Sequence, residues 1–233
     1  MKPRRAVLAA LLLLLAAGFV ALGIWQVERR AWKHALIDAV ETRSIATPVA
    51  APGPGAEPQA YRRVRATGRF LHDRETLVRA VSELGSGYWV ITPLDTGAFT
   101  VLVNRGFVSQ DRREAATRVA GNPAGEVTVT GLLRITEPGG GFLRSNDPAN
   151  DQWYSRDVAA IAAARGLSNV APYFIDADAT PNPGGYPVGG LTVLRFPDNH
   201  LGYALTWFAL ALMSVAGAWL VLRNRSVPPN KEA

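Results

Sequence analysis

One histidine stands where it could bind a metal ion beside a membrane span. His200 ends a short polar run and directly precedes 22 residues without a charge, 201–222. Neutral imidazole is the commonest metal ligand among side chains, and it titrates near neutral pH. The chain has three histidines and no cysteine, so few other side chains could take a soft-metal role.

The spacing of nearby aromatic residues predicts a binding face around this histidine. On a helix, positions i, i+3 and i+7 share one face, so His200, Tyr203 and Trp207 would line up. Such a face could offer a flat apolar macrocycle an aromatic wall and an axial nitrogen from His200, a haem-iron ligand. Alternatively, His200 only hydrogen-bonds at the helix start, and the two aromatic residues form an interfacial belt. His72 is expected in a polar turn and His34 on an interfacial helix, neither as a ligand.

Two uncharged stretches predict membrane helices. Residues 6–25 would form a helix about 30 Å long, enough to cross a hydrocarbon core, and residues 201–222 form the second such run. The first could instead be a signal peptide, because Lys2, Arg4 and Arg5 precede a leucine block. Its apolar character continues to Trp25, which favours an uncleaved anchor. Trp25, Gln26 and Arg29 would anchor this helix, or face the second span and close a cofactor groove.

The distribution of charge predicts topology and excludes one class of partner. Of the net +6, residues 1–25 carry +3 and residues 201–233 carry +2, which leaves +1 for the centre. The basic tail after the second span indicates that both termini are cytoplasmic and the central domain extracytoplasmic. The high pI therefore reflects topology and gives no support for nucleic-acid binding. The absence of cysteine excludes a disulfide framework.

The patterning predicts an α+β membrane protein. Its segments would be a cytoplasmic tip and span (1–25), a helix extension and proline-rich linker (26–60), an extracytoplasmic β-rich domain (61–200), a second span (201–222) and a basic tail (223–233). Alternation and turn residues predict an antiparallel barrel or sandwich, with strands over residues 61–71, 88–92, 99–108, 127–134, 172–176 and 191–196. One short helix is expected, with Ser155 as its cap, Asp157 in its first turn and Gly166 at its end.

Other polar residues favour structural roles over catalysis. Asn104 and Arg105 lie inside an apolar strand and predict a turn or bulge, although Arg105 could instead pair with a ligand carboxylate. Asp176 and Asp178 could join Asp157 around a hard cation, but acids in a loop rich in proline and glycine are usually solvated. The sequence contains no HExxH, P-loop or GxGxxG motif, and it predicts no enzyme.

Ordered motifs along the chain resemble one family. They are Leu22-Gly23-Ile24-Trp25-Gln26, Glu28-Arg29-Arg30, Trp32-Lys33, Tyr61-Arg62-Arg63-Val64, Gly68-Arg69-Phe70, Gly87-Tyr88, Thr92-Pro93-Leu94, Val101-Leu102-Val103-Asn104-Arg105-Gly106-Phe107-Val108, Asn146-Asp147-Pro148, Trp153-Tyr154-Ser155-Arg156-Asp157, Pro172-Tyr173-Phe174-Ile175-Asp176 and Asn199-His200-Leu201-Gly202-Tyr203-Ala204-Leu205-Thr206-Trp207-Phe208. In this order, between two anchors, they resemble the surfeit-locus protein 1 family of cytochrome c oxidase assembly factors.

The resemblance implies a role in building the haem–copper terminal oxidase. Bacterial members are thought to receive haem a from its synthase and to help place it in oxidase subunit I. The family's histidine at the start of the second span matches His200, and its tryptophan seven residues later matches Trp207. The implied cofactor is haem a, held in passing, and the implied partners are the bilayer, haem a synthase and oxidase subunit I. A scaffold for oxidase subunits that binds no haem is the alternative.

Overall fold

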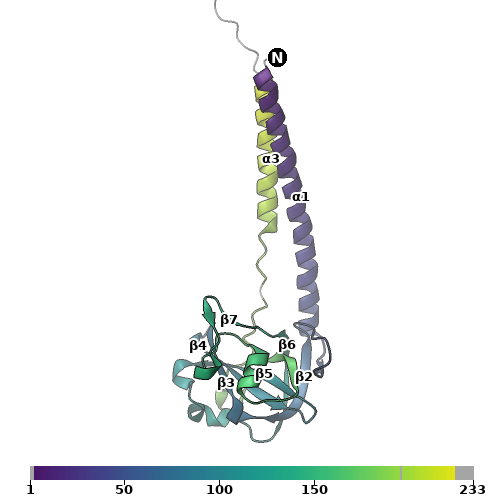
Figure 1. Cartoon of the computed structure of the whole chain (residues 1–233). Helices are drawn as coiled ribbons and strands as arrows, with labels where there is room; N and C mark the ends of the chain where they lie inside the picture. Colours follow the sequence, from purple (N-terminus) through teal and green to yellow (C-terminus); the bar gives the residue numbers. More distant parts are fainter. Residues whose placement is uncertain (1–2, 195, 224–233) are drawn as a thin grey trace, which may run out of the picture. The chain divides into compact units, whose positions relative to one another are not determined.

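The computed structural model describes residues 3–194 and 196–223 (Figure 1). The chain divides into two compact units. One consists of Met1–Asp38 together with Arg195–Ala233, and the other of Ala39–Leu194. The first unit is helical and the second is built around a β-sheet.

Two long helices form the first unit. Helix α1 spans Pro3–Ile45, so its C-terminal turns extend into the second unit, and α3 spans His200–Arg223. Each contains a stretch long and apolar enough to cross a membrane. Helix α1 continues for some 20 residues beyond its apolar stretch, as the helical spacing of apolar residues after Trp25 predicts.

Small residues recur every seven positions along the contact between α1 and α3. The buried positions are Ala9, Ala16 and Gly23 on α1 and Ala204, Ala211 and Ala218 on α3. Phe19 stacks on Trp207 with ring centroids 5.7 Å apart. A Cβ at Gly23 would lie 2.5 Å from the ring of Phe208, so only glycine allows this approach. A strict seven-residue repeat is the pattern of helices that wind around each other with a left-handed supercoil.

The second unit is a closed, barrel-like sheet. The strands are β1 (Val49–Ala50), β2 (Arg63–Phe70), β3 (Thr76–Ser82), β4 (Gly85–Asp95), β5 (Thr100–Ser109), β6 (Glu126–Ile135) and β9 (Val170–Ala177), in the spatial order β1-β2-β6-β9-β5-β4-β3. Strand β2 also pairs with β4 through Arg69↔Asp95 and Phe70↔Leu94, and this pairing closes the barrel. All neighbours are antiparallel except β1–β2 and β5–β9.

Shorter elements complete this unit. They are the hairpin of β7 (Gly140–Gly141) and β8 (Arg144–Ser145), helix α2 (Val158–Ala164), and the 3-10 helices η1 (His72–Arg74), η2 (Gln110–Arg112), η3 (Ala115–Gly121), η4 (Pro148–Asn150) and η5 (Pro183–Gly185). The β1 strand lies within the predicted linker and pairs with β2.

Two apolar clusters lie on opposite faces of the sheet. The inner cluster fills the barrel with alternate residues of its strands, among them Val64, Val103 and Tyr173. The outer cluster joins β4, β5 and β9 to α2 through Trp153 and Ile161, both 1% exposed. Strand β5 is therefore buried on both faces, which explains the apolar residues on both sides of its Asn104-Arg105-Gly106 segment.

The predicted strand over residues 191–196 is wrong for the residues that the structure describes, 191–194 and 196, none of which is in a strand. The physical reason is that this segment runs beside β5 and β9. Gly190 donates its backbone N–H to the carbonyl of Ala177. Just before it, Val188 forms an isolated bridge with Phe107 of β5, but the pairing does not continue into residues 191–194, where the Thr192 hydroxyl donates to the Asp176 side chain. The other five predicted strands are confirmed, and β1, β3, β7 and β8 are additional strands.

The α2 cap is a smaller correction. Asp157, not Ser155, is the N-cap, since its Oδ1 accepts the N–H of Ala160 at 3.1 Å. Ser155 instead donates to the Glu137 carbonyl at 2.7 Å. Gly166 follows the helix with φ of +61°, as its predicted terminal position requires.

Candidate functional site

His200 is the first residue of α3, and both its backbone and its ring are held. Its N–H donates to Oδ1 of Asp198 at 3.0 Å, which satisfies one free donor of the helix N-terminus. Its ring Nδ1 lies 2.7 Å from the side-chain oxygen of Gln26 on α1. Within residues 3–194 and 196–223, the other ring nitrogen, Nε2, has no hydrogen-bond partner. The half-buried ring therefore has one nitrogen engaged and one available.

Basic side chains of α1 hold the segment that leads into α3. Asp198 Oδ2 accepts a hydrogen bond from His34 Nε2 at 2.6 Å and lies 3.5 Å from Arg30 Nε. Lys33 donates to the carbonyl of Pro197. The backbone N–H of His200 and the His34 side chain lower the pKa of Asp198 below its ordinary value. Lys33 and His34 follow Arg30 by three and four positions, so all three basic side chains lie on one face of α1.

The structure places His200 and Trp207 toward α1 and Tyr203 away from it. Trp207 is half-buried against Phe19, whereas Tyr203 is 57% exposed. Gln26 faces the second helix, while Trp25 is 53% exposed. The available nitrogen of His200 therefore lies at the end of a tightly packed seam, with Tyr203 on its flank.

The remaining histidine lies in the β-unit and has a local role. His72 is in the 3-10 helix η1, as its predicted turn position requires. Its Nε2 lies 3.0 Å from the carbonyl oxygen of Pro123, and a carbonyl only accepts, so Nε2 carries the proton and donates. The ring also packs at a tilt on Phe70. These contacts tie η1 to the end of the barrel.

Asn104, Arg105 and Gly106 form a β-bulge, as their position predicts. Three residue steps on β5 oppose two on β4 here, and Gly106 has φ of +132°. Arg105 is 1% exposed and donates to Asn122 Oδ1 at 2.9 Å and to the carbonyl of Gly121. Burial lowers its pKa to about 10. Its guanidinium lies 4.8 Å from the centre of the Phe70 ring, which completes a structural anchor for the η3 segment.

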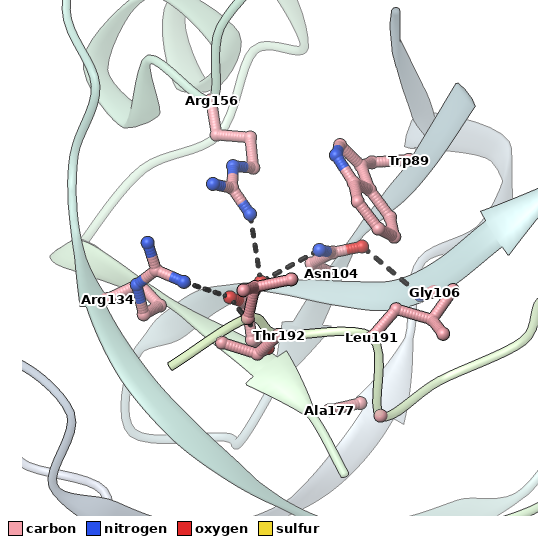
Figure 2. Close-up of a pocket in the computed structure, with 11 residues that line it drawn as sticks. Trp89, Asn104, Gly106, Arg134, Arg156, Ala177, Leu191 and Thr192 are labelled. Atoms are coloured by element: carbon pink, nitrogen blue, oxygen red, sulfur yellow. Dashed lines mark hydrogen bonds and ion pairs between the residues drawn. The ribbon is translucent and has the colours of Figure 1, made fainter. Parts of the chain in front are cut away.

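A polar cavity of about 210 Å³ lies on the outer face of β5, β6 and β9 (Figure 2). Its centre is Asp176, which is 3% exposed. Asp176 Oδ1 accepts from Asn104 at 2.8 Å and from Arg156 at 3.1 Å, while Oδ2 accepts from Arg134 at 2.7 Å and from Thr192 at 3.1 Å. Every hydrogen-bonding direction of the carboxylate is occupied by a donor, which leaves no vacant oxygen for the hard cation considered from the sequence.

Charge in this cluster is balanced. Arg156 also forms a bidentate pair with Glu137, with N–O distances of 3.0 and 2.6 Å. Burial lowers the pKa of Arg156, but the hydrogen bond to Glu137 and the charges of Asp176 and Glu137 raise it by more. The Thr192 hydroxyl adds the segment after β9 to the network. The cluster therefore joins four separate stretches of chain around one carboxylate.

Sequence reasoning did not find this network. Its one signal was an aspartate at the end of the apolar run Pro172-Tyr173-Phe174-Ile175, where a buried acid requires partners. The partners come from β5, β6, the turn before α2 and the segment after β9. Their spacing in the sequence has no period that would reveal a common centre.

Fold and site together define a protein with two paired apolar helices, α1 and α3, a closed β-barrel domain between them in sequence, and a histidine at the start of α3.

The SURF1 family model matches residues 13–212. The chain is 38% identical to Surfeit locus protein 1 of Mus musculus over 219 residues, covering 85% of this chain and 70% of the relative. The Homo sapiens protein is 37% identical over 221 residues (86% and 72%), and a SURF1-like protein of Monosiga brevicollis is 38% identical over 222 residues (88% and 83%). The chain belongs to the SURF1 family.

Proposed function

We propose that this protein is an assembly factor for cytochrome c oxidase, anchored in a membrane by α1 and α3. Family membership supports the role, because the match covers the whole β-unit together with most of α1 and about half of α3. The charge pattern supports an orientation with both termini cytoplasmic and the barrel domain on the outer side of the membrane, which we propose is a bacterial inner membrane.

The proposed cargo is haem a, received from haem a synthase and passed to oxidase subunit I. The observation that carries this proposal is Nε2 of His200, an imidazole nitrogen without a hydrogen-bond partner among the described residues, which would hold the haem iron. Trp207 and Tyr203 would supply aromatic surface beside it. The haem would bring the iron and its redox chemistry, whereas the chain would hold and orient the group. No acid–base or nucleophilic step is needed for this role.

The test is the visible spectrum of the protein purified after co-expression with a haem a synthase. We expect wild type to carry a haem a band and His200→Ala to lose most of it. His72→Ala is the matched control, since it also removes an imidazole, but from the β-unit and 128 residues before His200 in the sequence. If wild type purifies without haem, or if His200→Ala keeps the band unchanged, the haem proposal is wrong.

A second candidate function is a scaffold that docks oxidase subunits without binding haem. It is favoured by the tip of the β7–β8 hairpin, where Phe142 and Leu143 are 91% and 87% exposed. Adjacent large apolar side chains this exposed are typical of a contact surface. The scaffold predicts that Phe142→Ser with Leu143→Ser lowers oxidase yield while His200→Ala does not. The opposite pattern would favour haem handling.

A further inference from the structure

The contact between Gln26 and His200 fixes which ring nitrogen of the histidine is available. An amide oxygen has lone pairs but no proton, so it can only accept a hydrogen bond. At 2.7 Å from this oxygen, Nδ1 of His200 must carry the proton and donate it. In a neutral ring the lone pair is then on Nε2, the nitrogen without a partner among the described residues.

We infer that Gln26 is a positioning residue: it holds His200 in the Nδ1–H form and directs Nε2 toward an incoming metal-bearing group. This inference rests on the proposed function and deepens it. In a metal-binding histidine, the ring nitrogen that does not bind the metal usually donates a hydrogen bond. Its partner sets the tautomer, orientation and basicity of the ring. Gln26 supplies that partner from a helix 174 residues away in sequence.

Gln26 is itself held by the seam between the helices. It lies seven positions after Phe19 and three after Gly23, both of which contact α3. The same helical face therefore carries all three residues, and the packing of Gly23 against Phe208 sets the height of Gln26 along α3. On the other side, Asp198 fixes the backbone of His200. The ring is thus oriented from two directions, by its main chain and by Nδ1.

The first measurement needs no haem. Nitrogen NMR of the full chain in detergent, labelled with 15N-histidine, reports which ring nitrogen of each histidine is protonated. His200→Gln identifies the His200 signals among three histidines. We expect wild-type His200 to be protonated at Nδ1 and unprotonated at Nε2. We expect Gln26→Leu, which lacks an acceptor, to shift the ring toward the Nε2–H form, and Gln26→Glu to restore the Nδ1–H form.

The second measurement is a titration of the same proteins with haem a. Loss of the hydrogen bond to a metal-binding histidine typically weakens binding by about 10- to 100-fold, and we expect that loss in Gln26→Leu. Gln26→Glu should bind at least as well as wild type, because a carboxylate accepts the Nδ1 proton more strongly. Val27→Ala, next to Gln26 and 49% exposed in wild type, is the control for a general disturbance of α1.

Two results would overturn the inference, and both differ from failure of the proposed function. One is an Nε2–H ring in wild-type His200. The other is haem binding that depends on His200 but is unchanged in Gln26→Leu. If wild type binds no haem a at all, the proposed function fails, and the NMR comparison alone then decides whether Gln26 positions the ring.

Discussion

Replacing Asp176 with alanine tests whether the barrel depends on its buried carboxylate. The substitution would leave four donors without their acceptor, two of them on the guanidinium groups of Arg134 and Arg156. These arginine side chains are only 19% and 15% exposed, so water cannot fully replace the lost acceptor. Removing one partner of a buried ion pair costs about 3–5 kcal/mol.

For a unit of this size, such a loss corresponds to a fall in Tm of about 6–20 °C. The assay is thermal unfolding of the full chain in detergent, followed by near-ultraviolet circular dichroism, to which Trp89 at the cavity contributes. Asp176→Asn keeps one acceptor oxygen and should fall between wild type and Asp176→Ala.

Asp73→Ala is the matched control. Asp73 is 79% exposed and lies 3.9 Å from Arg74, and such surface pairs contribute at most about 1 kcal/mol. If Asp176→Ala and Asp73→Ala melt within about 2 °C of each other, the carboxylate does not hold the barrel, and the reasoning on the buried cluster is refuted.

Three further predictions concern single positions. Gly23→Val should separate α1 from α3, because its side chain would collide with the Phe208 ring. Cysteines engineered on facing positions of the two helices should then form disulfide cross-links more slowly, and an unchanged rate would contradict the prediction. Gly131→Ala should destabilise the barrel by more than 1 kcal/mol in urea unfolding, since its Cβ would overlap a backbone carbonyl of β9; a neutral result would refute this contact. Burial raises the pKa of Glu137, but Arg156 lowers it by more, so the folded-state pKa lies below the unfolded value of about 4.5. The ionised Glu137 therefore stabilises the folded protein above pH 4.5, and this stabilisation is lost as the pH falls through the folded-state pKa. Between those two pKa values wild type should therefore lose stability more steeply than Glu137→Gln, and equal slopes in urea unfolding at matched pH would contradict the pairing.

The sequence predicted most strands because their burial patterns are local. Strand β2 alternates between buried and exposed residues, and β5 begins and ends with apolar runs, residues 101–103 and 107–108, so each has a recognisable pattern. Closure of the barrel was not predictable in detail, because it depends on two residue pairs between β2 and β4. The absence of strand pairing at residues 191–194 was not predictable either, because this segment is held by Phe107, Ala177 and Asp176, which are distant in sequence.

The candidate site was predictable in its central residue and less so in its surroundings. His200 stands out because a lone imidazole precedes an uncharged helix. The sequence named Gln26 among residues that could face α3, and the structure confirms that position. It could not give the register of the two helices, which decides that Gln26 meets His200 and that Phe19 meets Trp207.

The seven-residue repeat of small residues has a consequence for how the gene can change. Each residue inserted into α1 or α3 rotates all later side chains by 100° around the helix axis. A single insertion between Ala16 and Gly23 would rotate Gly23, Gln26 and all later residues of α1 relative to Ala9 and Ala16, so the two halves of the helix could not both keep their contacts with α3. Length changes of seven residues, which rotate the helix by about 700° and so return it to within 20° of the same face, should therefore be tolerated better than changes of one or two, whereas apolar substitutions on the outer faces leave the contact intact. In the barrel domain, by contrast, the β7–β8 hairpin can gain or lose residues without shifting any other register.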